Sequence, residues 1–412
     1  MRKSIFILLL ALVCATAVAQ ENSVTPTEKE VREYPFLLID SPAKLSTMRQ
    51  ADENMLSLYR MAIRGVNSAL PYRWSALIQA GVSGFVLIPF SHEEGHRSIL
   101  TYNNIGSVSR PYFNKAGAAY VQGVTDATLV ALRDNHLPQF LRMHTAGLES
   151  DYATLLRENS LMTFGGESLD VLWVEYMMRK VALVGYYAWG LFKADIGIKE
   201  EADELRRDIV GHDIYGAVRH MHRPTAEYQR YVNYGDLTGE ERKFVRRVGW
   251  LSLLNLVDPS LFTKTGFSLK NGDRINFALG YSMAPFGDFI DQHFWWATRS
   301  FNTHFYVREY GNKTRWFPAL GAEISDMKLG SRLAVAAAIH GWQQPEMLSF
   351  TSKEGRFGGA VELMGKFMLN RDISRFGISA DLGITAKSEG FLLEYMAMER
   401  HLGVRFGTSL WF

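Results

Sequence analysis

The residues with the clearest capacity for chemistry are His92-Glu93-Glu94-Gly95-His96, an H-E-x-x-H motif. On a helix the two histidines stand at i and i+4, one turn apart on the same face, so their imidazoles can bind one Zn²⁺. Glu93 adjoins the first histidine, where a carboxylate can take a proton from a zinc-bound water and pass it to a leaving group. The motif therefore predicts a hydrolytic zinc site.

The element that carries this motif is expected to be a helix that follows the apolar run 82–90. Because proline disturbs the helical hydrogen bonds, Pro89 predicts that this helix begins or kinks near Phe90. Gly95 weakens the helix by about 1 kcal/mol. It also leaves the backbone bare, at a place where a substrate strand could approach.

A zinc site of this kind needs a third protein ligand, and two glutamates are candidates. Glu149 lies on a helix expected over 137–159, in which Ala146 and Gly147 would allow a close approach to the motif helix. Glu167 lies where the next helix begins, a position that carboxylates often occupy because of the helix dipole. We therefore favour Glu149 as the third ligand, with Glu167 as the alternative.

Further polar residues could complete the site or assist it. Asp151, Asp170 or another histidine could be the third ligand, or either aspartate could orient a ligating imidazole through its other ring nitrogen. His212 with Asp213 could donate a hydrogen bond to a developing oxyanion. The structural alternative for the His212–Asp213 pair is a partly exposed helix end.

The H-E-x-x-H motif resembles that of the zincin metallopeptidases, over five residues. No third histidine lies between Arg97 and Gly106, as the metzincin motif would require. The resemblance is therefore to the gluzincin type, whose third ligand is a glutamate on a later helix. It implies a zinc metallopeptidase in which His92, His96 and Glu149 hold Zn²⁺ and Glu93 is the catalytic base.

The chain from about residue 28 to 262 has the apolar spacing of helices. Two stretches, 76–90 and 171–192, are unusually apolar. The first is too short to span a bilayer, and the second contains three charged residues, so we favour buried core helices over membrane helices. This part of the chain is expected to form the helical metallohydrolase domain, residues 20–262.

From about residue 273 the apolar period changes from helical to two, which predicts strands. In 356–369, Phe357, Val361 and Leu363 share one face while Glu362 and Lys366 share the other. About eight strands are expected, near residues 275–283, 296–310, 315–326, 330–342, 356–369, 375–387, 391–398 and 401–412.

These strands fit two architectures. A soluble sandwich would place the apolar face inward, whereas a transmembrane barrel places it against lipid and encloses the polar face. Small residues beside single charges on the second face, and aromatic residues near strand ends, favour the barrel. The chain also ends on Phe412 within an alternating strand, which resembles the insertion signal of bacterial outer-membrane barrels.

The amino terminus predicts export. Arg2 and Lys3 precede an apolar run of about 14 residues, shorter than the roughly 20 needed to span a bilayer, and small residues end at Ala19. A signal peptide, residues 1–19, is expected, although Cys14 could alternatively carry a lipid. The 45 basic and 43 acidic residues leave a net charge of +2, which argues against nucleic-acid binding.

The sequence therefore predicts an α + β protein with a helical zincin-like domain followed by a small antiparallel transmembrane β-barrel, residues 263–412. The expected function is a zinc-dependent metallopeptidase of the bacterial outer membrane that acts on peptides or proteins of the cell envelope. One alternative is a non-enzymatic barrel protein with a helical scaffolding domain. Another is a zinc amidase or deacylase that acts on lipid or cell-wall substrates.

Overall fold

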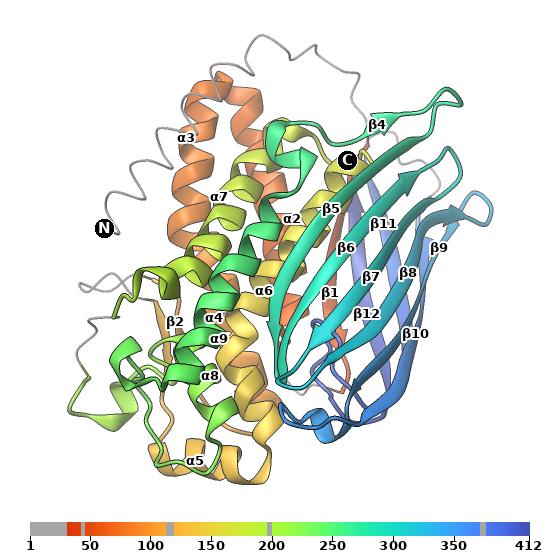
Figure 1. Cartoon of the computed structure of the whole chain (residues 1–412). Coiled ribbons are helices and arrows are strands. Elements are labelled where there is room, and N and C mark those ends of the chain that lie inside the picture. Colours follow the sequence, from red (N-terminus) through yellow and green to blue (C-terminus); the bar gives the residue numbers. More distant parts are fainter. Residues whose placement is uncertain (1–30, 43–45, 113–118, 196–199, 371–375) are drawn as a thin grey trace.

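A computed structural model describes residues 31–42, 46–112, 119–195, 200–370 and 376–412. The expected signal peptide and Cys14 lie outside these residues. The described chain forms a helical layer packed against one large curved antiparallel sheet (Figure 1).

The helical layer is formed between residues 48 and 262. Its α-helices are α2 (Met48–Ala69), α3 (Tyr72–Val82), α4 (Ile88–Tyr102), α5 (Asp126–Asn135), α6 (Leu137–Thr163), α7 (Leu169–Ala188), α8 (Asp213–His222) and α9 (Gly239–Leu251). A π-helical turn, η1 (Ser83–Leu87), joins α3 to α4. Short 3₁₀ turns are η2 (Trp189–Phe192), η3 (Glu204–Arg206), η4 (Tyr234–Asp236), η5 (Ser252–Leu256), η6 (Pro259–Phe262) and, within the sheet region, η7 (Glu346–Leu348).

The large sheet has ten strands in the order β1-β12-β11-β10-β9-β8-β7-β6-β5-β4. They are β1 (Glu33–Asp40), β4 (Phe267–Ser268), β5 (Arg274–Ala284), β6 (Gly287–Ala297), β7 (Asn302–Gly311), β8 (Trp316–Lys328), β9 (Leu333–Pro345), β10 (Gly355–Met368), β11 (Gly377–Lys387) and β12 (His401–Trp411). A separate two-stranded antiparallel sheet pairs β2 (Val108–Arg110) with β3 (Tyr120–Gln122).

The structure corrects several expected strands. The segment expected near 296–310 is divided between β6 and β7 by the hairpin at 298–301, and most of β6 lies earlier in the chain. The segment 391–398 is a buried connection, because three of its carbonyls accept hydrogen bonds from Arg142 of α6. The segment 33–40, placed in the helical part, forms β1 because β12 pairs with it from the other end of the chain.

The period-two alternation from the sequence is confirmed, with the polar face turned inward. On the inner face, which packs against α6, Tyr152 Oη donates to Asp291 Oδ2 at 2.7 Å and Trp295 Nε1 donates to Ser160 Oγ at 2.8 Å. Buried polar residues of this face are Asp291, His293, Arg308, Ser379, Asp381, Thr385, Arg405 and Ser409. Exposed apolar residues of the outer face are Phe294, Leu320, Ile339, Val361, Leu363, Phe367, Leu382, Ile384, Leu402, Val404 and Phe406.

The sheet does not close on itself among the described strands, because β1 and β4 are its outermost members and do not pair. The expected closed barrel is therefore not confirmed. Helical side chains cover the backbone of the β1 edge instead. Asn54 of α2 accepts from Leu37 N–H and donates to Leu37 C=O, while Ser57 donates to Pro35 C=O.

The motif helix α4 begins at Ile88, close to the start or kink expected near Phe90, but it continues directly from α3 and η1 as one helical run. Pro89 lies in the first turn of α4, and η1 widens the helix just before it, with Ile88 N–H donating to Ser83 C=O five residues earlier. Such π turns accommodate irregularities within α-helices. The whole run Tyr72–Tyr102 is long and apolar enough to cross a membrane, judged by length and composition alone.

Candidate metal centre

Two helices cross closely at the H-E-x-x-H motif. A Cβ at Gly95 of α4 would lie closer than 3.0 Å to the Ala146 carbonyl of α6, and a Cβ at Gly147 would lie closer than 3.0 Å to the His92 ring. The close approach expected from the small residues of α6 is therefore confirmed. The backbone of Gly95 is covered by α6, so it is not open to a substrate strand as we had expected.

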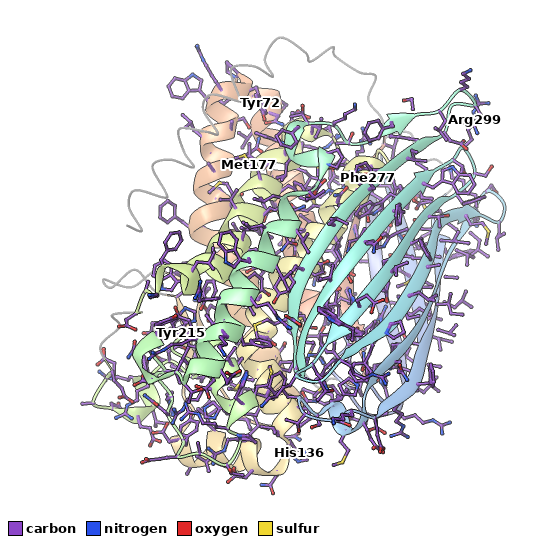
Figure 2. All side chains as sticks on the ribbon, viewed as in Figure 1. Tyr72, His136, Met177, Tyr215, Phe277 and Arg299 are labelled. Carbon is purple, nitrogen blue, oxygen red and sulfur yellow. The ribbon has the colours of Figure 1, made fainter. Side chains whose placement is uncertain are left out.

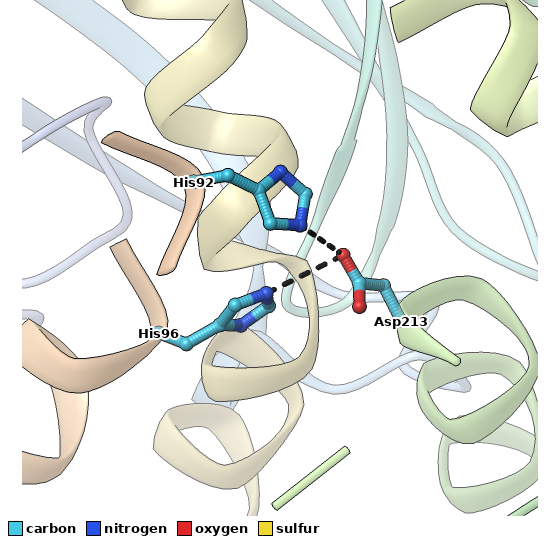
Figure 3. Close-up of side chains that lie close together, drawn as sticks. All are labelled: His92, His96 and Asp213. Atoms are coloured by element: carbon cyan, nitrogen blue, oxygen red, sulfur yellow. Dashed lines mark ion pairs between the residues drawn. The ribbon is translucent and has the colours of Figure 1, made fainter. Parts of the chain in front are cut away.

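Three side chains converge beside this crossing (Figure 3). His92 Nε2 lies 3.1 Å and His96 Nε2 lies 3.5 Å from Oδ2 of Asp213, the first residue of α8. Two ligand atoms bound to one tetrahedral zinc, each about 2.0–2.1 Å from it, stand about 3.3 Å apart. The ligand atoms of all three side chains lie within 4.8 Å of one another, a spacing compatible with one shared metal ion.

Hydrogen bonds fix both imidazoles with Nε2 toward this point. His92 Nδ1 donates to Asp151 Oδ2 at 2.8 Å, and His96 Nδ1 donates to the Met143 carbonyl at 2.6 Å. Because Nδ1 carries the proton in each ring, the lone pair of a neutral imidazole is on Nε2. Arg179 of α7 donates to the other oxygen of Asp151 at 2.6 Å and so holds that carboxylate in place.

The charge balance around Asp213 favours an ionised ligand. Burial by itself raises the pKa of Asp213, but His96 and His92 outweigh burial and hold that pKa well below its ordinary value. The nearby Asp208 differs, because burial raises its pKa to about 6. Asp213 is thus the more readily ionised of the two carboxyl groups.

Two more residues flank the cluster. Glu93 is 7% exposed, and no residue of the described chain makes a hydrogen bond or ion pair with its carboxyl group. Tyr186 of α7 accepts a hydrogen bond from Asp213 N–H at 3.3 Å, and its ring centroid lies 5.9 Å from that of His92. A carboxyl group and a phenol thus stand next to the three ligands.

The two expected third ligands lie elsewhere. Glu149 makes a bidentate pair with Arg142, with distances of 2.6 and 2.9 Å, and also accepts from Glu394 N–H. Glu167 pairs with Arg60 and Arg64 of α2. Both glutamates are therefore paired with arginines, and the carboxylate that lies beside His92 and His96 is that of Asp213.

Of the other polar residues considered from the sequence, some contact the cluster and others do not. Asp151 orients a candidate ligand, one of the two roles considered for it, whereas Asp170 accepts from Asn67 at 2.9 Å. His212 stacks on Tyr215, with ring centroids 3.9 Å apart. Sequence reasoning had noticed Asp213 only as a partner of His212. It had missed Tyr186, because a tyrosine within an apolar helix gives no signal of chemistry.

The arrangement offers two imidazoles and one carboxylate to a metal, with a buried glutamate beside them. Two nitrogens and one oxygen are a donor set found in catalytic zinc sites. Among the described residues, no fourth His, Cys, Asp or Glu joins the cluster. No protein-family model matches the chain, and the comparison with curated proteins finds no match either.

Proposed function

We propose that the protein is a zinc-dependent hydrolase, and that its substrates are peptides or proteins. The observation that carries the proposal is the convergence of His92, His96 and Asp213. Glu93, which directly follows His92 in the chain, is buried beside them. A structural zinc site is closed by four protein ligands, whereas a catalytic site leaves one position open. The three-residue cluster supports the catalytic kind over the structural site of a scaffolding domain.

Each residue has a defined part in this mechanism. His92, His96 and Asp213 would hold the zinc, which supplies Lewis acidity and lowers the pKa of a water at the open position. Glu93 accepts a proton from the attacking water and later gives it to the leaving nitrogen. Tyr186 is the candidate donor to the oxyanion of the tetrahedral intermediate.

We further propose that the outer face of the sheet lies in the bacterial outer membrane, after export by a cleaved signal peptide. In a soluble protein the apolar face of a sheet packs on the core, but here the polar face is buried and large apolar side chains are exposed. Leu363 and Ile384, for example, are 54% and 49% exposed. A continuous exposed surface of many large apolar side chains is typical of a face that contacts lipid or another protein.

Zinc content is the direct test of the metal centre. Purified protein rinsed with chelator is compared with His96→Ala, Asp213→Ala and Glu149→Gln. One zinc per chain is expected in the wild type and in Glu149→Gln, and its loss is expected in the other two variants. Zinc retained by Asp213→Ala but lost from Glu149→Gln would reverse the assignment of the third ligand.

Hydrolysis separates a catalytic from a structural metal. With a peptide library as substrate, Glu93→Gln should keep one zinc per chain but lose cleavage, because the amide cannot accept the proton. Glu94→Gln is the matched control, since Glu94 pairs with Arg97 and lies outside the cluster. Full cleavage by Glu93→Gln, or no zinc-dependent cleavage by the wild type, would contradict the proposed activity.

A further inference from the structure

An uncharged, outward-facing surface runs along α3, η1 and the start of α4. Residues 74–90 contain no Asp, Glu, Lys, Arg or His, while Arg73 precedes them and His92 follows. Trp74, Ile78 and Phe85 are 53%, 39% and 50% exposed on this surface. At 1.5 Å per residue the stretch is about 25 Å long, close to the roughly 30 Å hydrocarbon thickness of a bilayer.

A second surface of this kind follows α9. In residues 250–262 the single charged residue is Asp258, which is buried and paired with Lys180. Trp250 and Phe262 are 61% and 78% exposed. Arg247 precedes this stretch and Lys264 follows it, so charges bracket it as they do the first.

Polarity on α9 changes along the helix axis. Its first turns carry Glu240 and Lys243, whose side chains are 70% and 76% exposed, whereas its last residues include Trp250. An ordinary surface helix changes polarity around its axis, because one side faces the core and the other faces water. A change along the axis is what a boundary between water and lipid requires.

These two helical surfaces meet the outer face of the sheet at both of its edges. At one edge Leu279 N–H of β5 donates to Val257 C=O, and Asn255 exchanges two hydrogen bonds with the Tyr281 backbone. At the other edge, Leu38 and Ile39 of β1 are exposed. The neighbouring helix α2 packs on β1, carries exposed Leu58, and is followed in the chain by α3 (Figure 1).

The hydrogen bonds at the two edges of the sheet matter for a protein surrounded by lipid. Hydrocarbon offers no hydrogen-bond partner, so an open sheet edge cannot face it. The contacts of Asn54 and Ser57 with β1, and of Asn255 and Val257 with β5, give these strands the partners that a closed barrel would supply. An open sheet can therefore span a bilayer when helices complete its perimeter.

We propose that the lipid-facing wall of this protein is mixed, with the outer face of the sheet continued around the molecule by 74–90 and 250–262. The partner of both helical surfaces is the bilayer hydrocarbon. Tyr72, Met177 and Phe277 lie in one half of the molecule and Tyr215 and His136 in the other (Figure 2), which puts α3 level with the apolar part of β5. The inference rests on the membrane insertion proposed above.

The mixed wall also locates the metal centre. His92 is two residues beyond Phe90, or about 3 Å along the helix axis. The H-E-x-x-H motif therefore stands at the end of the lipid-facing stretch, at the boundary of the membrane. Substrates that are tethered to the bilayer or emerge from it would reach such a site.

Spin labels on single cysteines test the mixed wall. Cys14 is the one native cysteine and precedes the expected cleavage site, so Phe85→Cys and Phe262→Cys each provide a unique site in the mature chain. Leu363→Cys reports on the sheet, and Lys243→Cys reports on water. In vesicles of phosphatidylethanolamine and phosphatidylglycerol, the accessibility of each label to oxygen and to a water-soluble nickel complex is compared.

The inference predicts that labels at Phe85 and Phe262 have the high oxygen-to-nickel ratio of the Leu363 label, several-fold above that of Lys243. If the labels at Phe85 and Phe262 had the low oxygen-to-nickel ratio of the Lys243 label while the Leu363 label kept a high ratio, the mixed wall would be overturned. Membrane insertion of the sheet would then still stand. A Leu363 label that also matches Lys243 would overturn membrane insertion itself. Low accessibility to both reagents at Phe85 would show a covering protein surface and would also overturn the inference. Zinc content verifies that each variant is folded.

Discussion

At the scale of single residues, the candidate metal centre depends on glycines that let two helices touch. Gly147→Ala would put a methyl group into the His92 ring, so the ring or the helix must move. Overpacking of this kind costs about 1–3 kcal/mol. We expect a lower melting temperature and weaker zinc binding, measured by thermal unfolding and by competition with a chelator. Gly65→Ala in α2 is the control, because a Cβ there meets nothing within 4 Å; an equal loss of zinc in both variants would contradict the prediction.

Asp151 is the second residue on which the ligand geometry depends. Asp151→Asn keeps the shape of the side chain, but removes the charge that binds both His92 and Arg179. Loss of such a partner typically costs about 10–100-fold in metal affinity. We therefore expect the dissociation constant for zinc, measured by competition with a chelator, to rise by about 10–100-fold. Asp170→Asn is the control, because Asp170 contacts Asn67 rather than a ligand; unchanged zinc affinity in Asp151→Asn would refute the orienting role.

At the scale of elements, α8 positions Asp213 through its packing on α6. His220 of α8 is buried against Phe140 and near His144, with ring centroids 5.0 and 5.7 Å away. Burial lowers the pKa of His220 from 6.5 to about 4, and Arg133, Arg219 and Arg223 act in the same direction. The folded state therefore keeps this imidazole neutral at a pH where the unfolded chain protonates it.

Because His220 binds a proton less readily in the folded state, the free energy of unfolding depends on pH. Between pH 6.5 and 4 the unfolded chain binds more protons, so the free energy of unfolding falls as the pH falls. With about 1.4 kcal/mol per pKa unit, His220 accounts for a loss of about 2 kcal/mol between pH 7.5 and pH 5. His220→Leu should reduce the loss by that amount, measured by urea unfolding at both pH values. The control His136→Gln, at an exposed histidine, should not reduce this loss of unfolding free energy. Equal losses between the two pH values in the two variants would contradict the prediction.

At the scale of the whole molecule, the polar face of the sheet encloses α6 and the apolar face is exposed. Leu363→Arg distinguishes lipid from water around this outer face. An arginine at the middle of a bilayer costs about 2–4 kcal/mol, whereas a surface substitution in water stays within about 0.5 kcal/mol. We expect the larger loss, measured by unfolding from vesicles. Ser300→Arg in the β6–β7 hairpin should change stability little; equal small effects in both variants would place Leu363 in water.

Much of the local structure could be predicted from the sequence. The i, i+4 spacing of His92 and His96 and the alternation of 356–369 depend on the geometry of one element, so the pattern of side chains alone reveals them. The small residues of α6 likewise predicted its close approach to the motif helix. Two of the three residues in the candidate cluster and most of the long strands were predicted in this way.

Only the tertiary structure decided what pairs across long distances in the chain. Asp213 lies in the cluster and Glu149 does not, because Glu149 pairs with Arg142 and accepts a hydrogen bond from the backbone N–H of Glu394, far along the chain. A sequence does not show which distant groups meet a carboxylate in this way. The segment 33–40 is a strand because β12 supplies its partner. The two edges of the sheet do not pair with each other, and side chains of α2 and η5 contact the backbone of β1 and β5 instead. Each outcome depends on contacts between residues far apart in the chain, whereas local propensity is set by neighbours.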